Sequence, residues 1–132
     1  LAMNNRNFIR RFASFSIAMG CVHFVLETLF TVQYGQSLTG LLPDYIAVAL
    51  LLWAGVSVRG QVHTVGLLCG AWGFTLCLHY RAWAWRFEEV LAGEATAVVE
   101  TTMHVLSYTA PISILSFGLT LYFCSRAQTR EW

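Results

Sequence analysis

Four long apolar segments, separated by short polar stretches, run through this chain of 132 residues. Hydrophobic residues make up 57% of the sequence and charged residues only 11%, whereas a soluble domain carries about 25% charged residues. An apolar segment of about 20 residues can cross a membrane as a helix. The sequence therefore predicts a single all-α domain, an integral membrane bundle of four transmembrane helices at about 12–32, 38–58, 64–85 and 98–124.

The second segment has an ambiguous start. Pro43 followed by Asp44 is typical of a helix beginning, with Asp44 near the N-cap, but this start leaves only residues 45–58 for the span. Such a helix reaches about 21 Å, which is short of a hydrocarbon core of about 30 Å. Either the helix begins near Leu38 or the membrane is thin at this point.

The arginines predict the orientation of the bundle. Six of them fall on one side, namely Arg6, Arg10, Arg11, Arg59, Arg126 and Arg130, and only Arg81 and Arg86 fall on the other. The positive-inside rule then places the N-terminus and the C-terminus in the cytoplasm. The net charge of +1 gives no electrostatic support for a nucleic-acid partner.

Five ionisable side chains lie inside the apolar segments: His23, Glu27, His79, Glu100 and His104. A charged group at membrane depth costs several kcal/mol and usually belongs to a functional site. Counting about 1.5 Å per residue puts all five in the half of the membrane away from the cytoplasm. We expect them to line one polar pocket that opens to that side.

Carboxylates and imidazoles around an apolar pocket suit acid–base chemistry, in which a proton leaves one carbon and is returned to another. The first hypothesis is therefore a small membrane enzyme with isomerase-like or cyclase-like activity on a lipophilic small molecule, surrounded by membrane lipid and without a cofactor. The catalytic candidates are His23, Glu27, Glu100 and His104. The candidates for substrate contact, whose aromatic members could stabilise a positive charge, are His79, Trp72, Thr31, Tyr34 and Tyr108.

Two short motifs resemble those of the emopamil-binding sterol isomerase family. The stretch GCVHFVLE at 20–27 resembles the G-x-x-H-x-x-x-E segment of that family. The pair Glu-Thr at 100–101, followed by PISI at 111–114, is similar to its second motif. The family carries these motifs on consecutive spans, whereas two spans separate them in this chain. The resemblance implies that His23, Glu27 and Glu100 handle the proton while a double bond migrates.

Two alternatives remain open. His79 and His104 lie at similar depth, as the two axial ligands of a b-type haem would, so the chain could be a haem- and quinone-linked subunit of a larger membrane complex. Without haem, the same alternative describes a purely structural subunit of such a complex or a homo-oligomer. Glu27, His79 and His104 would also suffice to bind zinc or non-haem iron in a metal-dependent membrane enzyme.

Overall fold

The computed structural model describes residues 2–128 of the chain, and the side chains of residues 5–126. This part of the chain forms four α-helices, α1 (Ala2–Tyr34), α2 (Leu38–Gly60), α3 (Val65–Leu91) and α4 (Ala97–Gln128), with a 3-10 turn, η1 (Val62–Thr64), between α2 and α3. Each α-helix contains a stretch long and apolar enough to cross a membrane. The predicted all-α bundle of four transmembrane helices is confirmed.

The helices extend beyond the apolar segments that predict them. α1 includes Arg6, Arg10 and Arg11, which precede the predicted start, and α3 continues past residue 85 to Leu91. A helix satisfies its own backbone hydrogen bonds, so it can continue into the interface, where polar side chains reach water. Hydropathy therefore marks the part of each helix within the membrane and underestimates its length.

α2 begins at Leu38, the earlier of the two predicted starts. Ser37 is its N-cap, and the Ser37 Oγ accepts a hydrogen bond of 3.2 Å from the Gly40 N–H. Pro43 lies inside the helix. The prediction that Asp44 lies near the N-cap is therefore wrong, because Ser37 caps the helix seven residues earlier, where its hydroxyl satisfies a free backbone donor. The resulting helix of 23 residues is long enough to cross a membrane without thinning it.

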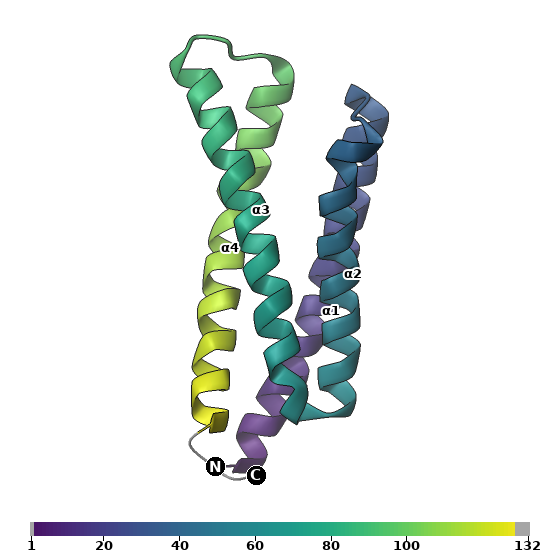
Figure 1. The fold of residues 1–132 in the computed structure, drawn as a ribbon, viewed down its shortest axis with the longest axis vertical. Helices are drawn as coiled ribbons and strands as arrows, with labels where there is room; N and C mark the ends of the chain where they lie inside the picture. The colour runs from purple at the N-terminus through teal and green to yellow at the C-terminus, as the bar shows by residue number, and fades with distance from the viewer. Residues whose placement is uncertain (1, 129–132) are drawn as a thin grey trace.

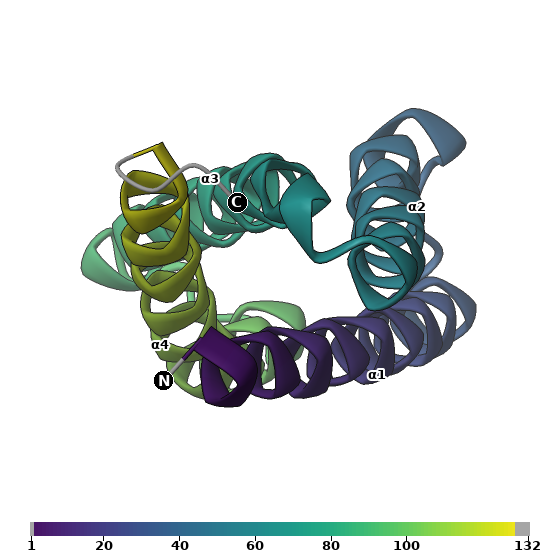
Figure 2. The same cartoon turned by 90° about the horizontal axis from the view of Figure 1, so that it is seen from below.

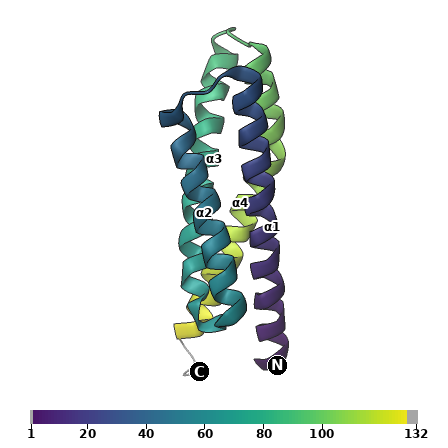
Figure 3. The same ribbon diagram turned by 90° about the vertical axis from the view of Figure 1, so that its right-hand side faces the viewer.

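The helices run alternately up and down, so α1 begins and α4 ends at the same end of the bundle (Figures 1 and 3). We call this the terminal end, and we call the opposite end, where 35–37 and 92–96 connect the helices, the loop end. Arg59, in the last turn of α2, lies at the terminal end, as does Arg126 in the last turn of α4. Arg130 lies outside the described residues. The cytoplasmic location of both termini stays a prediction.

The bundle consists of two helical hairpins. α1 packs chiefly on α2 and α3 on α4, and the hairpins meet mainly through α2 and α3. Viewed along the bundle, the four helices follow one another in chain order around a ring (Figure 2). Figure 1 shows the hairpins together at the terminal end and diverging toward the loop end.

Apolar packing is concentrated in the terminal half. A cluster of buried residues there joins α1, α2 and α3, and its members are Ile9, Ala13, Leu51, Ala54, Val58, Val65, Leu68, Ala71 and Trp72. Gly55 allows α1 and α2 to approach closely, because a Cβ atom at this position would lie 2.5 Å from the Cγ1 of Ile17 and 2.9 Å from the Ala13 carbonyl oxygen. Small residues at such crossings are typical of transmembrane packing. The packed terminal half therefore holds the two hairpins together, although they diverge at the loop end.

Candidate active site

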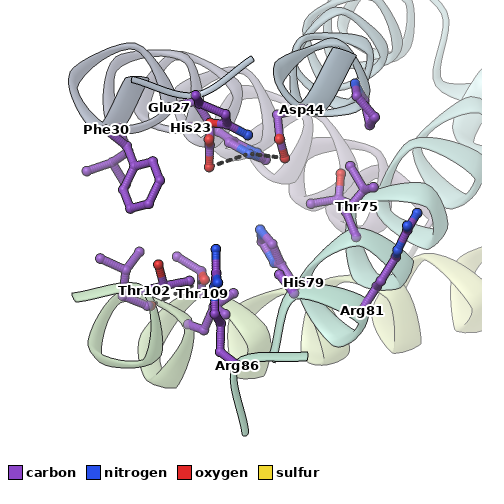
Figure 4. A pocket seen from close by; sticks show the side chains of 18 of the residues that line it. His23, Glu27, Phe30, Asp44, Thr75, His79, Arg81, Arg86, Thr102 and Thr109 are labelled. Atoms are coloured by element: carbon purple, nitrogen blue, oxygen red, sulfur yellow. Dashed lines mark hydrogen bonds and ion pairs between the residues drawn. The ribbon is translucent and has the colours of Figure 1, made fainter. Parts of the chain in front are cut away.

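A cavity of about 560 Å³ lies between the two hairpins in the loop half, and all four helices contribute to its lining. Its inner end is closed by Leu51 and Trp72, which belong to the buried cluster. The Trp72 indole N–H donates to the Ser16 Oγ over 2.9 Å, and this hydrogen bond fixes the orientation of the ring. We call this space the loop-end cavity (Figure 4).

A histidine between two carboxylates is the main polar feature of the cavity. The Nε2 of His23 lies 3.6 Å from the Oε1 of Glu27, one turn further along α1, and 3.6 Å from the Oδ1 of Asp44 on α2. The three side chains are 10%, 26% and 21% exposed, respectively. Each offers one ligand atom, and these atoms lie within 4.8 Å of one another. We call these three residues the His23 cluster, which could hold a proton or a metal ion.

Asp44 joins this cluster because α2 begins before it. On a helix from Leu38, Asp44 follows the buried Leu41 by three residues and precedes the buried Ala47, Val48 and Leu51 by three, four and seven. Residues at these spacings share one helix face. The buried face of α2 therefore turns Asp44 inward, and this periodicity was available in the sequence once the helix start was set at Leu38.

His79 on α3 faces the cluster from the other hairpin, and its ring centroid lies 5.5 Å from that of His23 (Figure 4). The Nδ1 of His79 is hydrogen-bonded to the Ser113 Oγ, and that hydroxyl donates to the Thr109 carbonyl oxygen over 2.8 Å. Because the Ser113 hydrogen is used in this way, the serine oxygen accepts from the Nδ1–H of His79. In the neutral ring, the Nε2 of His79 therefore carries a free lone pair.

The cavity collects some of the predicted site residues. His23, Glu27, His79, Trp72 and Tyr34 line it. The hydroxyl groups of Tyr34 and Thr101 lie 3.2 Å apart and connect α1 to α4. The sequence interpretation missed Asp44 and the threonines that line the cavity, which are Thr39, Thr75, Thr101, Thr102 and Thr109.

The other predicted residues lie outside the cavity lining. Glu100, His104 and Tyr108 are exposed on α4, where the rings of His104 and Tyr108 contact each other edge to face. Thr31 also lies outside the lining and donates to the Oε1 of Gln36 over 3.4 Å. The i,i+4 pair Glu100–His104 thus faces outward, and His104 does not join His79 or Glu27 in the cavity as the haem and metal alternatives require.

The inward face of α4 is marked by hydroxyl groups instead of charges. Buried or half-buried residues recur on it at alternating spacings of three and four: Val99, Thr102, Leu106, Thr109, Ser113, Ser116 and Thr120. A helix face with this repeat packs against its neighbours. Ser and Thr suit such a face in a membrane because they are small and can bond to their own backbone, as Ser113 and Thr120 do.

Two arginines on α3 line the outer part of the cavity, Arg81 and Arg86. The Nη1 of Arg86 donates to both carboxylate oxygens of Glu89, over 3.1 Å and 2.8 Å. Apolar side chains also line the cavity, with Leu26, Phe30 and Leu78 among them. The lining therefore combines the His23 cluster and His79 with apolar residues and two arginines.

Comparisons with protein-family models, with curated proteins and with solved structures gave no match to this chain.

Proposed function

We propose that this protein is an intramembrane enzyme that performs acid–base chemistry on a lipophilic small molecule bound in the loop-end cavity. The observation that carries the proposal is the pair of imidazoles whose ring centroids lie 5.5 Å apart, one beside two carboxylates and the other oriented by a serine. Such residues inside a membrane bundle are rare and belong to functional sites.

The two imidazoles take different roles in this proposal. The free lone pair on the Nε2 of His79 accepts a proton from a carbon of the substrate. The His23 cluster delivers a proton to another carbon, so that a double bond migrates with no change in oxidation state. Glu27 and Asp44 stabilise the imidazolium of His23 and any positive charge that develops on the substrate.

The cavity suits a lipophilic substrate. Its volume of about 560 Å³ lies within the range of about 300–1,000 Å³ that is typical of small-molecule sites. Apolar lining residues such as Leu26, Phe30 and Leu78 would hold a hydrocarbon body, while the His23 cluster and His79 would face the reacting carbons. The hairpins diverge toward the loop end (Figure 1), which favours entry of a substrate from the bilayer between them.

Deuterium incorporation tests the proposal without knowledge of the substrate. Detergent-purified protein is incubated in D₂O with a lipid extract from the membranes that contain it, and the lipids are analysed by mass spectrometry. We expect one lipid class to gain carbon-bound deuterium, because a proton returned to carbon comes from a group in exchange with solvent. The rate should fall by about 10²–10⁴-fold in His79→Ala.

The matched control for this test is His104→Ala, which removes a histidine from the exposed face of α4. It should exchange deuterium at the wild-type rate. Wild-type protein that adds no deuterium beyond a protein-free sample would refute the proposal, as would a His79→Ala variant as active as wild type.

A second candidate is a subunit of a larger membrane assembly, and the outward face of α4 favours it. Glu100, His104 and Tyr108 are exposed there, inside a stretch apolar enough to span a membrane. Polar side chains that face lipid are costly, so a protein partner or a second copy would stabilise them. Crosslinking in native membranes from His104→Cys, in a chain whose own four cysteines are replaced by serine, would give a defined adduct if this candidate holds and only monomer if it does not.

A further inference from the structure

We propose that the His23 cluster binds one divalent transition-metal ion, through the Nε2 of His23 and one carboxylate oxygen each from Glu27 and Asp44. The role of this ion in catalysis rests on the proposed function, but its binding does not.

The spacing within the cluster suits ligands better than hydrogen-bond partners. Both distances from the Nε2 of His23 to a carboxylate oxygen are 3.6 Å, which is too long for a hydrogen bond. Ligand atoms about 2.0–2.2 Å from a tetrahedral metal ion lie about 3.4 Å from one another. Small shifts of side chains would therefore bring all three atoms around one ion.

The charges in the cluster are balanced by a divalent ion. Glu27 and Asp44 supply two negative charges beside a neutral imidazole, so the site with the ion has no net charge. This matters in a membrane bundle, because an unbalanced charge in an apolar environment is expensive. No lysine or arginine forms an ion pair with either carboxylate among the described residues.

The ligand types indicate which ions fit. One imidazole and two carboxylates are a mixed nitrogen and oxygen set, which suits Zn²⁺, Fe²⁺ or Mn²⁺ better than Ca²⁺ or Mg²⁺, which prefer oxygen alone. Three protein ligands leave one coordination position of the ion open. Catalytic metal sites have such an open position, whereas structural sites do not. His79, which is not one of the three mutually close ligands, faces the cluster across the cavity (Figure 4).

With the ion bound, His23 would be a neutral ligand, so its imidazolium would no longer donate the proton in the proposed function. A water molecule in the open position would supply that proton instead, because a bound metal ion makes water more acidic. The hydrogen bond from His79 to Ser113 would keep the Nε2 of His79 directed toward that position. His79 would therefore act as the proton acceptor and would not be needed to bind the ion.

Cobalt provides a test with a spectroscopic readout. The detergent-purified full chain is stripped with a chelator and titrated with Co²⁺, whose visible absorption reports low-symmetry coordination by nitrogen and oxygen, and bound metal is counted by elemental analysis. We expect one Co²⁺ per chain, displaced by Zn²⁺. Asp44→Asn and the nearly isosteric Glu27→Gln should each weaken binding at least tenfold, whereas His79→Ala should retain the ion.

The controls use the same residue types outside the cavity. Glu100→Gln and His104→Ala should bind Co²⁺ like wild type, and circular dichroism and elution volume check that each variant is folded. Wild-type protein without stoichiometric Co²⁺ would overturn the inference, as would equal losses in Glu100→Gln and Glu27→Gln. Thiolate charge-transfer bands would also overturn it, because they would locate the ion at a cysteine.

The two proposals fail separately. Stoichiometric Co²⁺ in a protein that exchanges no deuterium would refute only the acid–base function. Full deuterium exchange in chelator-treated protein that binds no Co²⁺ would refute only the metal site.

Discussion

The terminal half and the loop half of the bundle differ in what holds their helices. In the terminal half, residues such as Leu51, Leu68 and Trp72 are at most 1% exposed and pack into one apolar cluster. In the loop half, the hairpins diverge around a cavity whose inner part carries His23, Asp44 and His79. We therefore expect changes in the terminal half to affect mainly stability, and changes in the loop half to affect mainly activity.

The largest expected effect is on the stability of the terminal half. Trp72→Ala removes the largest fully buried side chain and should lower the free energy of unfolding by about 3–5 kcal/mol, as truncation of buried aromatic residues does. His23→Ala in the loop half should cost much less. Reversible unfolding in mixed micelles measures both. Equal losses of stability in the two variants would show that the terminal half does not contribute more to stability than the loop half.

The second prediction concerns the close contact of α1 with α2 at Gly55 in the terminal half. Gly55→Val should destabilise the protein by about 1–3 kcal/mol, since its Cβ would collide with Ile17 and the Ala13 carbonyl. Gly118→Val is the matched control, because a Cβ there meets nothing within 4 Å. The same unfolding measurement applies. A Gly55→Val protein as stable as the control would contradict the packing of α1 on α2.

The third prediction concerns a substitution that should lower activity without changing the fold. Ser113→Ala removes the partner that orients His79. Loss of such a partner costs about 10–100-fold at metal-ligating histidines, and we expect a loss of activity of that order here. Ser116→Ala, which removes another buried serine from the same face of α4, should leave activity unchanged. Deuterium exchange rates measure both. Equal rates in the two variants would show that the Ser113 contact does not position His79.

The smallest effect is expected at the rim of the cavity. Arg86 and Glu89 are 30% and 24% exposed, and an ion pair of this kind contributes about 0–1 kcal/mol. Arg86→Gln should therefore leave unfolding almost unchanged. A loss well above this range would show that the rim, and not only the terminal half, holds the hairpins together.

Much of the fold could be predicted from the sequence because hydropathy alone determines four spans. The pair His23–Glu27 could also be predicted, since i,i+4 spacing places both side chains on one helix face whatever the rest of the bundle does. Both predictions depend only on residues within a single helix.

The rest of the site depends on how the helices face one another. Asp44 was missed because Pro43 resembles a helix start, whereas Ser37 caps the helix seven residues before Asp44. Glu100 and His104 were expected inside because charge is costly in lipid, but the repeat of Thr102, Thr109 and Ser113 turns the other face of α4 inward. Small hydroxyl residues, and not the charged ones, marked the packed face.

The most direct test of the central claim compares two histidine variants in one experiment. His79→Ala and His104→Ala are incubated with the same lipid extract in D₂O, and carbon-bound deuterium is measured in each lipid class. We predict exchange at the wild-type rate in His104→Ala and a loss of about 10²-fold or more in His79→Ala. Equal exchange in the two variants would contradict a catalytic role for the loop-end cavity.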